Sequence, residues 1–101
     1  MKLQFDGFDW DRGNAVKCQK HGLSVAVIES LFAYPLAILP DAKHSNEERR
    51  FRAIGRTAEG RIVFIVFTLR RKGEGQFIRP ISARYMHKKE VESFEKENPD
   101  L

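Results

Sequence analysis

The stretch that decides the fold is RIVFIVFTLRRKGEGQFIRPISAR, residues 61–84. Its first part, residues 61–71, is rich in β-branched and aromatic residues and almost continuously apolar, which predicts the buried central strand of a sheet. Gly73 and Gly75 supply the permissive backbone that a short hairpin loop needs. We therefore expect residues 76–84 to return as an antiparallel strand beside the first.

Pro80 interrupts this second strand, because proline has no N–H to donate to a ladder of hydrogen bonds. The strand therefore either lies at an edge near Pro80 or carries a bulge there. In an unbroken strand Arg79 and Arg84 would point to opposite faces of the sheet. A bulge at Pro80 would bring them towards one side.

The remaining elements are short and are separated by turn signals. Gly22 is the expected left-handed stop of the first helix, and Trp10 is expected to pack that helix onto the core. The strands over residues 36–39, 50–56 and 61–71 should form a meander. In chain order we expect a strand over residues 2–5, a turn at 6–7, a helix from a cap at Asp9 or Asp11 to Lys20, a helix over 25–33, strands over 36–39 and 50–56, and, after the hairpin, a helix over 88–98.

These elements predict an α+β fold, with a small antiparallel sheet, two N-terminal helices and one C-terminal helix. A chain of 101 residues fits a single domain over residues 1–101. Hydrophobic residues make up 42% and charged residues 32%, which is a globular composition. The longest apolar run is far shorter than a membrane-spanning helix, and the start has no signal-peptide core, so we expect a cytoplasmic protein without a membrane partner.

Cysteine and histidine give no sign of a metal or cofactor site. Cys18 is the only cysteine, so an internal disulfide is excluded, and we expect it to be a small, partly buried side chain on a helix. His21, His44 and His87 lie on separate elements without metal-ligand spacing. Since no phosphate-binding glycine loop is present either, the sequence predicts no metal and no cofactor.

Positive charge is concentrated on the predicted sheet. Lys and Arg number 18 against 14 Asp and Glu, a net charge of +4 that favours an anionic partner, of which nucleic acid is the commonest. Arginine offers a planar fork of donors that matches phosphate oxygens, and several on one face would also stabilise a pentacoordinate phosphorane. The arginines in question are Arg49, Arg50, Arg52, Arg56, Arg61, Arg70, Arg71, Arg79 and Arg84.

Cleavage of RNA without a metal needs, besides such cations, a group that activates the 2′-hydroxyl and a donor for the leaving oxygen. Glu48 and His44 are candidates for proton transfer, and Lys20 for an added cation. The alternative interpretation is that many of the arginines are solvated strand residues paired with Asp and Glu.

Several segments, in their order along the chain, resemble the BrnT family, the toxins of bacterial type II toxin–antitoxin pairs. The resemblance spans nearly the whole sequence, which makes it more specific than any single piece. Its segments are residues 14–24 (NAVKCQKHGLS), residues 44–45 (HS) with Glu48 and Arg50, residues 53–55 (AIG), residues 67–70 (FTLR), and residues 79–84 (RPISAR) with Glu90. Pro80 and Phe94 depart from the family's usual apolar, β-branched residue and tyrosine.

This resemblance implies a RelE-like fold and a metal-independent ribonuclease that arrests translation. It further implies neutralisation by a BrnA-like antitoxin, a toxin homodimer within a hetero-oligomer, RNA as substrate, and contact with DNA only through the antitoxin. Lys20, Glu48, Arg50, Arg70, Arg79 and Arg84 match the family's pattern and should include its functional groups. We therefore predict Glu48, Arg50, Arg70, Arg79 and Arg84 as catalytic residues and Lys20, His44, Arg52 and Arg71 as RNA-binding residues.

Two other classes of function stay open at this point. The chain lacks an unmistakable acid–base pair, so a catalytically silent homologue that only holds RNA or an antitoxin is an alternative. A purely structural subunit is a further possibility.

Overall fold

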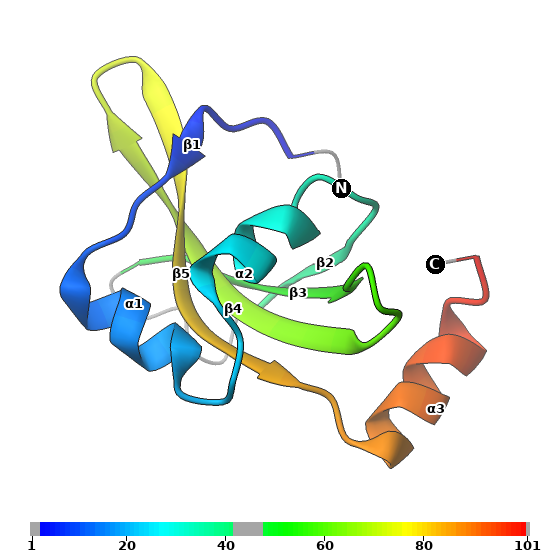
Figure 1. The fold of residues 1–101 in the computed structure, drawn as a ribbon. Helices are drawn as coiled ribbons and strands as arrows, with labels where there is room; N and C mark the ends of the chain where they lie inside the picture. The colour runs from blue at the N-terminus through cyan, green and yellow to red at the C-terminus, as the bar shows by residue number, and fades with distance from the viewer. Residues whose placement is uncertain (1–2, 42–47, 101) are drawn as a thin grey trace.

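A five-stranded sheet with three helices packed around it forms the body of the protein, as described for residues 3–41 and 48–100 by a computed structural model (Figure 1). The strands follow the order β1-β5-β4-β3-β2, with β4 in the centre. The elements are β1 (Gly7–Phe8), α1 (Arg12–Gln19), α2 (Val25–Leu31), β2 (Ala37–Pro40), β3 (Arg50–Arg56), β4 (Ile62–Lys72), β5 (Gly75–Tyr85) and α3 (Lys88–Glu97). The predicted central strand and its hairpin partner are therefore confirmed.

The sheet is mixed, which corrects the prediction of an antiparallel sheet. Strands β2 to β5 form an antiparallel meander, but β1 pairs parallel with β5 through Gly7↔Phe77 and Phe8↔Ile78. The predicted strand over residues 2–5 and turn at 6–7 are wrong over the described residues, since residues 3–5 form no strand and Gly7 is in one. Asp6 explains the difference: its N–H donates to the Gln76 carbonyl and its carboxylate accepts the Gln76 N–H, both at 2.8 Å.

The bulge expected near Pro80 is present in β5. Phe67 of β4 lies opposite Pro80 and Val66 lies opposite Ser82, so Ile81 is the extra residue. Beyond the bulge the alternation of side chains is shifted by one. Arg79 and Arg84 consequently point to the same face of the sheet, as expected for a bulged strand.

The helix boundaries differ from the predicted ones by one or two residues. Asp11 is the N-cap of α1, which ends at Gln19, and Gly22 takes a positive φ of 93° after it. Helix α2 ends at Leu31 and α3 ends at Glu97. Strand β2 is shifted by one residue and includes Pro40, which is tolerated because β2 is an edge strand. No helix in residues 3–41 and 48–100 has the length and apolarity needed to cross a membrane.

The main core lies between α1, α2 and one face of the sheet. Val63, Ile65 and Phe67 of β4 are fully buried there against Ile28 of α2. Trp10 packs against this core, as predicted, and its indole N–H donates to Glu29 at 2.8 Å. Residues of α1 complete the core, and the other face of the sheet is left to carry the polar residues considered below.

Cys18 of α1 is 0% exposed, and burial raises the pKa of its thiol to about 11. A thiol in this state is a packing group, in line with its predicted role.

Asn14 joins α1 to the bulge. Its side-chain amide donates to the carbonyls of Asp9 at 3.0 Å and Pro80 at 2.8 Å, and its side-chain oxygen accepts from the Asp11 N–H at 2.8 Å. Asn14 is 7% exposed, so these groups lie away from water.

We predict that Asn14→Ala lowers the free energy of unfolding by roughly 1–3 kcal/mol, because it leaves a buried carbonyl without a donor. Urea unfolding followed by circular dichroism measures the effect. The control is Gln19→Ala on the same helix. Its side chain is exposed and forms hydrogen bonds only with the nearby backbone of Ala15 and Val25. Equal midpoints for the two variants would contradict the structural role of Asn14.

Candidate functional site

Six of the predicted arginines point to the face of the sheet opposite the α1–α2 core; one of them, Arg56, lies at the end of β3, where Glu95 of α3 binds it at 2.8 Å. Side chains alternate along a strand, so every second residue of β3 and β4 points to this face. In β5 the bulge shifts the alternation by one residue, so that Arg79 and Arg84 both point to it. The positions that match across the three strands are Arg50, Arg52 and Ile54 of β3, Phe64, Val66, Thr68 and Arg70 of β4, and Phe77, Arg79, Ser82 and Arg84 of β5. We call this set the arginine face.

The register fixes how these side chains are arranged. Thr68 lies opposite both Arg50 and Arg79, so these arginines flank it on the neighbouring strands, with backbones roughly 10 Å apart. Arg70 is two residues further along β4. Arg84 lies opposite Phe64, on the order of 13 Å from the Thr68 row. Arg50, Arg70 and Arg79 therefore form one group, and Arg84 stands apart from it.

Arg70 is held by Glu48 in a two-point ion pair. Its Nε donates to Glu48 Oε2 at 2.6 Å and its Nη2 to Oε1 at 3.2 Å, and this bonding raises the pKa of Arg70. The two side chains are 44% and 39% exposed. The pair is therefore open to solvent and to a ligand, and an exposed pair of this kind is only weakly held.

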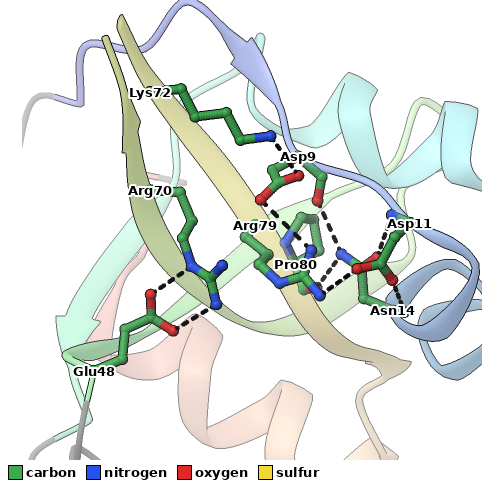
Figure 2. A network of polar contacts seen from close by, with 8 residues as sticks. All are labelled: Asp9, Asp11, Asn14, Glu48, Arg70, Lys72, Arg79 and Pro80. Carbon is green, nitrogen blue, oxygen red and sulfur yellow. Dashed lines mark hydrogen bonds and ion pairs between the residues drawn. The ribbon is translucent and has the colours of Figure 1, made fainter. Parts of the chain in front are cut away.

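Arg79 is held more firmly, by two carboxylates from the chain before α1 (Figure 2). Its guanidinium contacts Asp11 at 2.7 Å and Asp9 at 3.5 Å, and Lys72 also contacts Asp9 at 3.0 Å. The Asn14 N–H and then Arg79 lower the pKa of Asp11. The Arg79 side chain is only 20% exposed, so it is largely covered in this arrangement.

Arg84 is tied to the C-terminal helix. Glu90 of α3 accepts from both of its terminal nitrogens at 2.8 and 2.9 Å, and the Phe64 ring lies 5.0 Å below its guanidinium. Glu90 also accepts the His87 N–H at 3.0 Å. The bond to Arg84, followed by the one from His87, lowers the pKa of Glu90 to about 2. Helix α3 is in this way fixed to the edge of the arginine face.

The other predicted residues lie elsewhere or outside the described chain. Lys20 is exposed at the C-cap of α1, away from any contact that the structure gives to the arginines. Arg71 is exposed and, one residue after Arg70, points to the other side of the β4–β5 ribbon. Arg52 lies on the arginine face and is exposed. His44 falls outside the described residues.

Sequence reasoning missed three carboxylates of this site. Asp9 and Asp11 were considered only as helix caps, and Glu90 only as part of a family pattern. Asp11 has two roles, because one of its carboxylate oxygens caps α1 while the other binds Arg79. Among residues 3–41 and 48–100, no three His, Cys, Asp or Glu side chains are grouped in a way that could hold a metal ion.

The fold and this face define a class: a small α+β protein with an arginine-bearing sheet surface suited to a polyanion. The family model described as "Ribonuclease toxin, BrnT, of type II toxin-antitoxin system" matches residues 10–90, and the chain belongs to this family. The predicted family is thus confirmed, and with it the general function of a ribonuclease toxin that has an antitoxin partner. A search of curated proteins found no match.

The Glu90 geometry predicts a pH effect. The pKa of Glu90 is lowered from 4.5 to about 2 in the folded protein, so its ionised form stabilises the fold fully above pH 4.5. That contribution is lost as the pH falls from about 4.5 to about 2. Glu90→Gln should therefore lower the urea midpoint at pH 7 and have little effect near pH 2.

Glu92→Gln, an exposed change on the same helix, is the control and should leave the midpoint at pH 7 unchanged. The same loss of stability for Glu90→Gln at both pH values would exclude the Arg84 ion pair as its cause.

Proposed function

We propose that this chain cleaves RNA as a metal-independent endoribonuclease, by attack of a 2′-hydroxyl on the adjacent phosphodiester. The observation that carries the proposal is the group of Arg50, Arg70 and Arg79 around Thr68, with the Glu48 carboxylate bound to Arg70. In this proposal Glu48 is the base, and the three arginines are the cations around one phosphodiester. These are the elements that such a reaction needs.

Each residue has a role in this mechanism. Glu48 accepts the proton of the 2′-hydroxyl, a bond forms between the 2′-oxygen and phosphorus, and the bond from phosphorus to the 5′-oxygen breaks. Arg50, Arg70 and Arg79 stabilise the added negative charge on the phosphorane. The 5′-oxygen leaves with a proton from water or from His44, and the products are a 2′,3′-cyclic phosphate and a 5′-hydroxyl.

Arg84 and the more distant cations bind the RNA strand on either side of the cleaved bond. Arg84 is too far from Arg79 along β5 to reach the same phosphate without movement, and we assign it to a neighbouring one. Arg52, which is exposed on the same face, adds a contact to the RNA backbone, whereas Lys20 and Arg71 lie off this face and take no part in the proposed site. Such contacts position the strand and carry no sequence information.

The proposal extends to the chain's partners and setting. The internal ion pairs show that carboxylates fit the arginine face, so an acidic segment of a BrnA-like antitoxin is a suitable inhibitor. The family resemblance further supports a RelE-like single toxin domain over residues 1–101. It also supports a toxin homodimer in the antitoxin complex, contact with DNA only through the antitoxin, and action on RNA in the cytoplasm.

One observation favours the second candidate, a catalytically silent module that binds RNA or the antitoxin. Arg70, Arg79 and Arg84 are each already bound to a carboxylate of the chain itself. A polyanion has to compete with these pairs. If it takes only the exposed cations, it binds without reaching the geometry for cleavage.

The first test uses the purified protein, free of antitoxin, and an RNA oligonucleotide. Cleavage is expected in EDTA, at a rate unchanged by added magnesium, with a 2′,3′-cyclic phosphate as product by mass spectrometry. A single 2′-deoxy substitution at the cleaved nucleotide should abolish that cut, because the nucleophile is gone. Cleavage that requires magnesium would rule out the mechanism, and salt-dependent binding of intact RNA would favour the silent module.

The second test addresses Arg70. Arg70→Ala should lower kcat by about 10²-fold, because it removes a donor to the developing charge. Its effect on the free energy of unfolding should stay within about 1 kcal/mol, because the ion pair is exposed. Arg12→Ala, an exposed arginine at the start of α1, is the matched control and should keep full activity. An equal fall in kcat for the two variants would refute the role of Arg70.

A further inference from the structure

The Thr68 hydroxyl is buried without a hydrogen bond. Thr68 is 1% exposed, and its Oγ1 has no hydrogen-bond partner among the residues that the structure describes. In that part of the chain it is the only buried side-chain nitrogen or oxygen of this kind. Because a buried hydroxyl without a partner lowers stability, such a group in a folded protein calls for a reason.

Folding does not supply this reason. Thr68 lies in the central strand, where the adjoining residues Phe67 and Leu69 point to the opposite, core-facing side of the sheet. A β-branched side chain suits such a position, but valine has the same shape and carries no hydroxyl to bury. The shape of Thr68 is therefore explained by the strand, and its hydroxyl is not.

The surroundings of Thr68 indicate what the hydroxyl lacks. Its neighbours on the adjacent strands are Arg50 and Arg79, and Arg70 is two residues along its own strand. The hydroxyl has one proton to donate, and guanidinium groups cannot accept it because they are donors only. Glu48, Asp9 and Asp11, the carboxylates bound to Arg70 and Arg79, make no hydrogen bond to this hydroxyl. The Thr68 proton therefore lacks an acceptor at the centre of the cationic group.

We propose that Thr68 is a substrate-binding residue whose hydroxyl donates a hydrogen bond to a non-bridging oxygen of the phosphodiester that is cleaved. This inference rests on the proposed function and names a further contact in the same site. A phosphate oxygen is an acceptor that the surrounding arginines attract and orient. Threonine hydroxyls are common donors to phosphate in protein–nucleic acid complexes.

Access to Thr68 follows from the Arg70–Glu48 pair. Both side chains are about half covered, and their ion pair faces solvent, so a phosphodiester can take Arg70 from Glu48 at small cost (Figure 2). The same exchange brings the phosphate over Thr68 and frees the Glu48 carboxylate to accept the 2′-hydroxyl proton. Binding of substrate and release of the base are thereby one event.

The test compares Thr68→Val, Thr68→Ser and Thr57→Val. Thr68→Val should unfold at the same or a higher urea concentration than the wild type and cleave RNA at least 10-fold more slowly. Thr68→Ser keeps the hydroxyl and should cleave within threefold of the wild-type rate. Thr57→Val is the matched control, because the Thr57 hydroxyl is satisfied by the Arg61 N–H at 3.1 Å. It should be less stable than the wild type and cleave RNA normally.

Two results would overturn the assignment of Thr68. Cleavage by Thr68→Val within twofold of the wild-type rate would show that the hydroxyl does not contact the substrate. A lower urea midpoint for Thr68→Val would show that the fold itself uses the hydroxyl. Failure of the proposed function is a separate result, since the wild type would then leave RNA intact.

A binding measurement tests the Thr68 contact even if the wild type does not cleave RNA. The affinity for a 2′-deoxy analogue of the oligonucleotide, measured by fluorescence anisotropy, should fall at least fivefold in Thr68→Val, whether or not the wild type cleaves RNA. Equal affinities would overturn the contact. Unchanged RNA binding with weaker binding of a polyglutamate peptide would overturn it too, in favour of a protein carboxylate as the acceptor.

Discussion

The bulge at Ile81 is the constraint on which the arginine face depends. Arg84 is five positions after Arg79, an odd offset, so a regular strand would send one of them into the core. The extra residue resets the alternation, and both side chains point away from the α1–α2 side of the sheet. Asn14 secures the bulge through the Pro80 carbonyl, so the first helix and the second half of the hairpin are held as one unit.

Carboxylates of the chain itself neutralise much of this face. Glu48, Asp9, Asp11 and Glu90 between them bind three of its arginines. Such pairs fix the guanidinium groups in place, but they also compete with a phosphate for the same donors. The pairs differ in exposure, since the Arg70 side chain is 44% exposed and the Arg79 side chain 20% exposed. Arg70 is therefore the arginine that a polyanion can reach most easily, whereas Arg79 is largely covered and bound to Asp9 and Asp11.

This difference connects the electrostatics to the chemistry of a ribonuclease toxin. A single phosphate has little advantage over a carboxylate that is already in place, whereas an RNA strand offers many phosphates to several cations at once. In our proposal, capture of Arg70 frees the Glu48 carboxylate, and the phosphate meets the Thr68 hydroxyl, for which the described part of the fold provides no acceptor. The same exchange is open to an acidic protein segment. In the proposed function, one face serves both the RNA and an acidic inhibitor.

Periodicity and turn chemistry in the sequence predicted most of the sheet. The apolar run over residues 61–71 identified the central strand and the glycines identified the hairpin, while Pro80 predicted an edge or a bulge, of which the structure has the bulge. These features are local, because they depend on the residue types within one or two elements. The family pattern added Glu48 and the arginines as a set. It could not say which of them lie together.

Only the tertiary structure determined the parallel strand β1 and the partners of the arginines. Two residues of β1 carry no periodic signal, and they form a strand because Asp6 bonds to Gln76, 70 residues away. Asp11 and Arg79 are 68 residues apart, and no rule of sequence spacing relates them. The sequence by itself determined the hairpin of β4 and β5 and the strand β3 beside it, since these follow from local backbone preferences, but it left open whether Arg79 and Arg84 share a face. Which carboxylate binds each arginine, and which hydroxyl is left without a partner, depends on side chains that meet only when distant strands and helices pack.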